Sequence, residues 1–151
     1  MKITDIRFGM LRVPLKTPFK TALRTVDTIE DVVISVHTDT GHVGYGEAPA
    51  TAVITGDTHG SIIEAIHKII APRIIGQEIA NLNRITRLIQ GALEKNSSAK
   101  AAVEIAVYDL FAQLYNAPLY DAYRCRPDWK ALEKPLNVAD RRRATVCGGK
   151  S

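Results

Sequence analysis

Arg24 is the residue with the clearest chemical potential in this sequence, because it stands among small and apolar residues in the segment Pro18–Val26. A guanidinium group is planar and presents paired N–H donors that match a carboxylate. Binding residues also concentrate on loops that a rigid scaffold positions. The residues alone leave two interpretations, a carboxylate-binding arginine or an ordinary surface arginine, and they favour the second.

Other catalytic patterns are missing from the sequence, which has no glycine-rich phosphate loop, no HExxH motif and no nucleophile elbow. The four histidines are scattered, and we interpret them as surface or interface residues: His37, His42, His59 and His67. Three acidic residues are interpreted as structural hydrogen-bonding groups: Glu47, Glu104 and Asp109. Cys125 and Cys147 make no zinc pattern. We therefore predict no catalytic residue and no metal ligand in this chain.

The first half of the chain must supply the strands that position these residues. Residues 2–13 suit a strand, and Pro14 and Pro18 indicate a loop that we expect from Leu15 to Thr28. The β-branched run Val32–Thr38 predicts a second strand. Asp39–Gly41 predicts a turn, and His42–Ala48 a third strand that pairs back on the second. A second loop is expected over Pro49–Asp57.

The second half of the chain predicts helices, because apolar residues recur there at intervals of three and four. One begins at Thr58 or Ser61 and ends at Pro72 and Gly76, and another is capped by Asn81. The third covers Ser97–Tyr115, is capped by Ser97 or Ser98, and ends at Asn116–Pro118; Leu119–Tyr123 adds a short helical turn. The predicted fold class is α+β, a three-stranded antiparallel meander followed by a three- or four-helix bundle.

The third helix is expected to be central, because the first half of its apolar face is built from alanine. Small side chains let a neighbouring backbone come close. We therefore expect a sheet or another helix to pack tightly on Ala99, Ala102 and Ala106.

Charge separates the chain into two parts. Residues 1–124 hold 13 Lys+Arg and 13 Asp+Glu, whereas residues 125–151 hold 7 and 3, so the net charge of +4 lies in the last segment. This distribution speaks against nucleic-acid binding by the globular part. No apolar run reaches the roughly 20 residues of a membrane span, so we expect no membrane contact and a cytoplasmic location.

The sequence resembles a known family in three places. The pattern Ala99–Gln113 followed by Pro118–Asp121 is similar to the end of the N-terminal capping domain in the enolase superfamily, in its muconate-lactonizing branch. Pro18–Val26, together with Gly44–Pro49 and Val53–Asp57, resembles the cap of the L-Ala-D/L-Glu (dipeptide) epimerases. The resemblance therefore implies a capping domain over residues 1–124.

The resemblance also implies roles for particular residues. In such enzymes an arginine that matches Arg24 pairs with the side-chain carboxylate of an acidic dipeptide such as Ala-Glu. Phe19, Thr21 and Ile54 would shape that pocket and exclude water. The implied reaction is epimerisation next to the terminal carboxylate, through an enediolate that Mg²⁺ stabilises, with lysine bases on the two faces. The metal ligands and the lysines of such proteins lie on a barrel of about 250 residues.

No such barrel fits into the remaining residues, so we expect an isolated or prematurely ended cap that is inactive alone and binds no cofactor. The faces of the cap that would pack on a barrel are then left without a partner, so we expect the chain to self-associate through exposed apolar patches. The basic segment 125–151 is interpreted either as a solvated, disordered tail or as an out-of-frame ending. Two alternatives for the function stay open: a non-catalytic binding or interaction module with the cap fold, and the cap of a muconate cycloisomerase-like enzyme.

Overall fold

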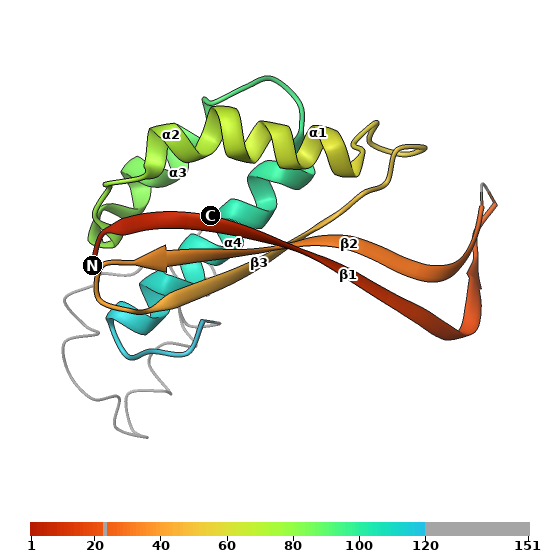
Figure 1. Ribbon diagram of the computed structural model, residues 1–151, viewed down its shortest axis with the longest axis horizontal. Coiled ribbons are helices and arrows are strands. Elements are labelled where there is room, and N and C mark those ends of the chain that lie inside the picture. Colours follow the sequence, from red (N-terminus) through yellow and green to blue (C-terminus); the bar gives the residue numbers. More distant parts are fainter. Residues whose placement is uncertain (23, 120–151) are drawn as a thin grey trace, which may run out of the picture.

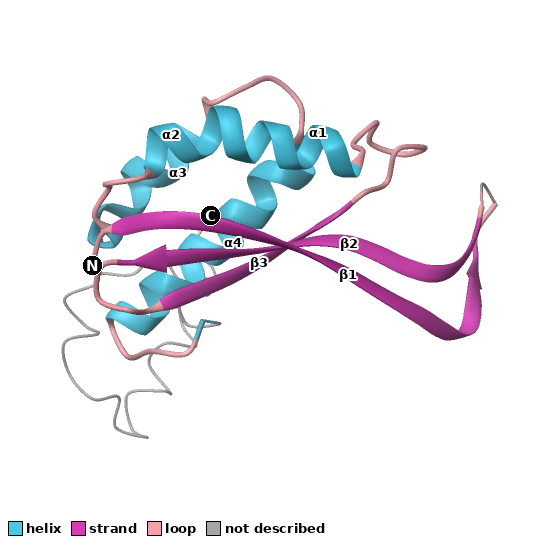
Figure 2. Ribbon diagram, in the orientation of Figure 1, coloured by secondary structure: helices cyan, strands magenta, loops and turns pink. Residues whose placement is uncertain are grey.

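Three strands followed by helices form the protein, whose computed structural model describes residues 1–22 and 24–119 (Figures 1 and 2). The sheet is antiparallel in the order β1-β2-β3, and the helices pack against it. The predicted α+β architecture is confirmed. The predicted tail 125–151 lies outside the described residues, as does most of the helical turn predicted for Leu119–Tyr123.

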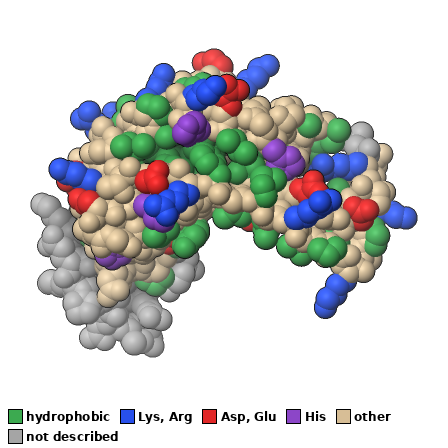
Figure 3. All heavy atoms as spheres, in the orientation of Figure 1, with side chains coloured by type: hydrophobic (Ala, Val, Ile, Leu, Met, Phe, Trp, Pro, Cys, Tyr) green, Lys and Arg blue, Asp and Glu red, His purple; other side chains and the backbone are tan. Residues whose placement is uncertain are grey.

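The first two strands are much longer than the sequence indicated. β1 spans Ile3–Lys20 and β2 spans Thr25–Thr38, so the loop predicted for Leu15–Thr28 is wrong. This hairpin extends beyond the body of the molecule (Figures 1 and 3). β1 tolerates Pro14 and Pro18 because it is an edge strand, where a missing N–H costs no ladder bond. A register shift in β1 between Pro14 and Phe19 accommodates the irregularity.

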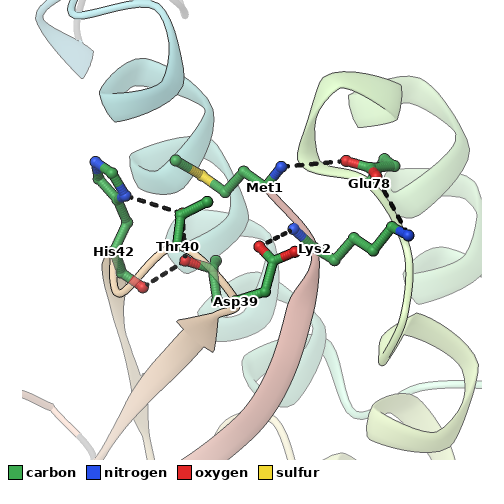
Figure 4. Close-up of polar contacts among 7 residues, drawn as sticks. Met1, Lys2, Asp39, Thr40, His42 and Glu78 are labelled. Carbon is green, nitrogen blue, oxygen red and sulfur yellow. Dashed lines mark hydrogen bonds and ion pairs between the residues drawn. The ribbon is translucent and has the colours of Figure 1, made fainter.

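The second hairpin agrees with its prediction and has a simple register. β3 (Val43–Pro49) pairs with β2 so that Val33 lies opposite Glu47 and His37 opposite Val43. The turn is closed by hydrogen bonds from the Thr38 hydroxyl and amide to the His42 carbonyl, at 2.9 and 3.1 Å. Figure 4 shows this turn beside the start of β1.

The start of β1 is held from two sides. The Lys2 amide donates to the Asp39 carboxylate at 2.7 Å, and the Met1 amino group lies 3.3 Å from Glu78 (Figure 4). Further along, the Ile3 amide donates to the Gln77 carbonyl at 3.0 Å. The first strand is therefore bound to the turn of the second hairpin and to the segment between the helices.

The first helix continues through a proline. α1 (His59–Glu64) leads into a π-helical segment, η1 (Ala65–Ile70), and then into α2 (Ala71–Ile74), with helical backbone angles at both junctions. The prediction that Pro72 ends the helix is wrong, because the wide π turn before it relieves the clash of the proline ring with the preceding turn. Gly76, with φ at +85°, lies just past the end. Thr58 and Ser61 form a capping box at the start, as predicted for Thr58.

A short 3₁₀ turn, η2 (Ile79–Asn81), precedes α3 (Leu82–Gln90). Asn81 occupies the cap position of α3, as predicted, but its side chain makes no cap hydrogen bond. The inward face is confirmed by the burial of Leu82, Ile85 and Ile89.

α4 (Ser97–Leu114) packs directly on β3, and its alanine face is buried as predicted. A Cβ added at Gly44 would overlap the Ala106 carbonyl oxygen, and one at Gly46 would overlap the Ala102 carbonyl oxygen. The alternating glycines of β3 therefore let its backbone touch that of α4. The amide of Tyr45, between the two glycines, donates to the Asp109 carboxylate at 3.1 Å, which confirms the structural role predicted for Asp109.

The start of α4 corrects another prediction. Asn96, with φ at +48°, is the cap residue and makes no side-chain cap bond, so neither Ser97 nor Ser98 caps the helix. The Ser98 amide donates instead to the carboxylate of Asp57, at 3.3 Å. That acceptor comes from a loop 41 positions earlier in the chain, where no local sequence pattern could indicate it. In the described part of the chain, none of the helices has both the length and the apolarity to cross a bilayer.

Candidate functional site

A groove of about 510 Å³ lies between the extended hairpin and the segment that follows β3. Phe19 and Arg24 line it from the hairpin, Asp31 from the middle of β2, and Pro49 from the end of β3. His59, the first residue of α1, also lines it. The groove thus joins the two segments in which the sequence placed its candidate residues.

Arg24 is held by the tight turn of the hairpin. The amide of Thr21 donates to the Arg24 carbonyl at 2.8 Å, and the Arg24 amide donates to the Thr21 hydroxyl at 3.1 Å. The Thr21 hydroxyl in turn lies 3.2 Å from the Arg24 carbonyl. Thr21 is exposed, and its hydrogen bonds shape the turn that carries Arg24. Phe19 and Arg24 line the groove, but Thr21 is not among its lining residues.

The charges around the groove leave Arg24 available. Glu30 pairs with Arg12 at 2.8 Å, so its carboxylate is already neutralised by another arginine. Arg24 is half-buried and makes no ion pair with any of the residues that the structure describes. A half-buried guanidinium without an internal counterion can pair with an anion from solution.

Asp31 and Glu47 form a carboxyl pair across β2 and β3, where Glu47 lies opposite Val33. A hydrogen bond to Asp31, desolvation and the negative charge of Asp31 raise the pKa of Glu47 above its ordinary value. The protonated form of Glu47 is therefore more favoured than it is in an isolated glutamate. This agrees with the structural hydrogen-bonding role predicted for Glu47. The Asp31 side chain, only 9% exposed, also lines the groove.

Ile54 lies on the loop between β3 and α1, outside the residues that line the groove. Its side chain is 66% exposed, beside that of Val53. The loop is a single turn in which the amides of Ile54 and Thr55 donate to the Thr51 carbonyl at 2.8 and 2.9 Å. Of the four candidate binding residues, the structure brings Phe19 and Arg24 together and places Thr21 and Ile54 at the margins.

Two features of the groove were missed by sequence reasoning. His59, which the sequence indicated to be a surface or interface histidine, has its Nε2 atom 2.9 Å from the Glu30 carbonyl and lines the groove. No local pattern links these residues, which are 29 positions apart. The Asp31–Glu47 pair could have been found by counting back from the Asp39–Gly41 turn, because a hairpin turn fixes the register of both strands.

Magnesium ligands can be tested against the side chains present. In residues 1–22 and 24–119, no three His, Cys, Asp or Glu side chains are grouped so that they could hold a metal ion. Asp31 and Glu47 make a pair of carboxyl groups, with no third ligand grouped beside them among these residues. The described residues therefore do not fit a magnesium centre of this reaction. Glu104, on α4, has a buried Oε1 atom with no hydrogen-bond partner among these residues, so the structural pairing predicted for it is not seen at that atom.

The sequence of this chain matches a known family and several known enzymes. Residues 4–122 match the family described as the mandelate racemase / muconate lactonizing enzyme N-terminal domain. The chain is 49% identical over 120 residues to the L-Ala-D/L-Glu epimerase of Clostridium acetobutylicum, covering 80% of this chain and 34% of that protein. It is 51% identical to the corresponding epimerase of Bacillus subtilis, covering 80% and 33%.

Solved structures agree with the sequence matches. The substrate-liganded L-Ala-D/L-Glu epimerase of Bacillus subtilis superposes with a TM-score of 0.77 at 51% identity, over 80% of this chain and 33% of that one. The dipeptide epimerase of Enterococcus faecalis, complexed with Mg and L-Leu-L-Tyr, superposes with a TM-score of 0.74 at 33% identity, over 80% and 34%. The chain thus spans about a third of the length of these relatives. By sequence and fold together, the chain belongs to the N-terminal domain family of the mandelate racemases and muconate lactonizing enzymes.

Proposed function

We propose that this chain is the substrate-specificity cap of a dipeptide epimerase, and that its groove receives the acidic side chain of a dipeptide such as Ala-Glu. The observation that carries the proposal is the position of Arg24. It lines a groove with Phe19 and makes no ion pair with the residues that the structure describes. The identity of about 50% to two L-Ala-D/L-Glu epimerases supports the same substrate class.

The proposed binding follows from charge and shape. Arg24 pairs with the side-chain carboxylate of the dipeptide, while Phe19 covers the apolar part of the ligand and excludes water. Glu30 does not compete for Arg24, because Arg12 already neutralises it. Thr21 contributes by fixing the turn, and Ile54 by covering the ligand from the second loop.

The cap binds and shields, and it leaves the chemistry to other residues. In a complete enzyme the bound magnesium would stabilise negative charge that develops next to the terminal carboxylate of the substrate. The described residues supply neither its ligands nor, in this proposal, the base. The family match to residues 4–122 supports a cap unit that ends near Arg124, as we propose from the sequence.

The test is a binding titration of the 151-residue chain with L-Ala-L-Glu, with L-Ala-L-Gln as the neutral isostere. We expect the acidic dipeptide to bind at least about tenfold more tightly, since a hydrogen bond to a charged group contributes about 1.5–3 kcal/mol. Arg24→Gln should abolish this preference. Arg7→Gln is the matched control, because Arg7 lies on the same hairpin but pairs with Asp5 and does not line the groove. Equal binding of both dipeptides, or an unchanged preference in Arg24→Gln, would contradict the proposal.

A further inference from the structure

The loop that carries Ile54 is fixed at both ends, and its second anchor is a buried carboxylate. The loop begins where β3 ends, and β3 is held on α4 by the contacts of Gly44 and Gly46 with the helix backbone. At its second end, Asp57 is 5% exposed and accepts a hydrogen bond from the Ser98 amide, in the first turn of α4. Both ends of the loop are thus attached to the same helix.

Asp57 also connects to the interior of the loop. Its amide donates to the Thr55 hydroxyl at 3.2 Å, and that hydroxyl lies 3.2 Å from the Thr51 hydroxyl. The amides of Ile54 and Thr55 donate to the Thr51 carbonyl. A continuous set of hydrogen bonds therefore leads from the start of α4, through Asp57, to the turn on which Ile54 stands.

The start of α4 has a specific need for this carboxylate. The first amides of a helix have no partner within it, and a negative charge there is favoured by the helix dipole. Asn96 supplies no side-chain acceptor at the cap position, so Asp57 takes that role from outside the helix. Gly56, with φ at +82°, provides the backbone conformation that turns the chain toward it.

We infer that Asp57 is a positioning residue: by tying the loop between β3 and α1 to α4, it fixes Thr51, which lines the groove, and the turn that carries Ile54 beside it. Its effect on ligand binding rests on the proposed function, whereas its effect on the loop does not. Asp57 itself does not line the groove, so it acts through the loop and not by touching the ligand.

The test compares Asp57→Ala and Asp57→Asn with Glu94→Ala in the full chain. Glu94 is an exposed carboxylate in the segment before α4 and serves as the matched control. Amide hydrogen exchange, measured by NMR, reports on the loop through Ile54 and Thr55, and on the neighbouring helix through Ile62. In Asp57→Ala we expect exchange at Ile54 and Thr55 to rise about tenfold, with Ile62 unchanged.

A helix-capping role without positioning predicts a different result. Exchange would then rise at Lys100, in the first turns of α4, and stay unchanged at Ile54; this outcome would overturn the inference. Asp57→Asn keeps an acceptor oxygen and should recover part of the protection. If Asp57→Ala does not fold, the question is decided by Asp57→Asn and by the double variant Asp57→Asn/Ser98→Pro, which also lacks the Ser98 amide hydrogen. Loop exchange equal to that of wild type in both variants would contradict the anchor.

Ligand binding gives the second measurement. We expect Asp57→Ala to bind L-Ala-L-Glu about tenfold more weakly than wild type, with Asp57→Asn intermediate and Glu94→Ala unchanged. If the wild-type chain binds no dipeptide, the proposed function fails while the exchange data still decide the role of Asp57. If the wild type binds and Asp57→Ala binds equally well, the positioning role is wrong and the proposed function stands.

Discussion

The carbonyl oxygen of Ala102 lies where the Cβ of any larger residue in place of Gly46 would stand, so β3 and α4 meet backbone to backbone. One helical turn further, Ala106 and Gly44 repeat the relationship. Further along α4, Asp109 accepts from the amide of Tyr45, which lies between the two glycines, and the Gln113 side chain donates to the Val43 carbonyl. These contacts hold β3 on α4, and Pro49 at the end of β3 lines the groove.

Gly46→Ala should therefore destabilise the protein strongly. The added methyl group meets backbone, which cannot move aside as a side chain can, and overpacking of a core costs about 1–3 kcal/mol or more. Thermal unfolding followed by circular dichroism should show a midpoint lower by roughly 5–10 °C. The control is Gly9→Ala in β1, where the nearest atom to an added Cβ is the Val33 carbonyl oxygen at 4.0 Å. An equal, small effect of both substitutions would show that β3 and α4 are not this close.

Local patterns were enough to predict the elements that a single chain segment determines. The β-branched run from Val32 and the turn at Gly41 specified the second hairpin, because alternation and turn geometry both act over a few residues. The alanines of α4 correctly indicated a close neighbour. Arg24 and Phe19 could be placed at one site only through the family resemblance, since their own composition did not exclude an ordinary surface.

Features that depend on distant partners could not be predicted. Pro14 and Pro18 indicated a loop, but an edge strand tolerates proline, and edge position follows from the whole sheet. Ser97 and Ser98, at the start of α4, looked like caps, but the Ser98 amide donates to Asp57 instead. His59 lines the groove because α1, which it begins, packs against β2 and brings it to the Glu30 carbonyl, a contact that no local sequence rule describes.

The Glu47 carboxyl should make stability depend on pH. Its pKa is raised in the folded protein, so folding favours the protonated form. This contribution is fully present below the ordinary glutamate pKa and is lost as the pH rises through the raised folded value. Glu47→Gln, which keeps a donor for Asp31 but cannot ionise, should therefore gain stability over wild type as the pH increases from 4 to 7. Unfolding midpoints at several pH values would measure this difference.

Asp5 provides the opposite control. The hydrogen bond and charge of Arg7 lower the pKa of Asp5, so folding favours its ionised form. Its contribution is present above the ordinary aspartate pKa and lost as the pH falls through the lowered folded value. Asp5→Asn should therefore lose stability relative to wild type at neutral pH, with the difference shrinking in acid. Parallel pH curves for Glu47→Gln and wild type would contradict the raised pKa.

We expect the isolated chain to self-associate through its exposed apolar side chains. Met10 and Phe19 on β1 are 58% and 60% exposed, and Tyr45 on β3 is 61% exposed. Hydrophobic side chains also gather across the middle of the face seen in Figure 3. Sedimentation velocity should show a mass that rises with concentration. Met10→Ser should weaken this association, whereas Ile75→Ser, which changes an exposed residue just after α2, should not. A monomer at every concentration would refute the prediction.

The chain alone should not exchange the α-proton of a dipeptide. Removing that proton requires a base and a metal that stabilises the resulting charge, and the described residues group no three metal ligands. With L-Ala-L-Glu and Mg²⁺ in deuterated water, NMR should show no loss of the glutamate α-proton signal beyond a sample without protein. The L-Ala-D/L-Glu epimerase of Bacillus subtilis serves as the positive control. Exchange that scales with the concentration of this chain, and that disappears in Arg24→Gln, would mean that the chain carries the chemistry as well as the cap.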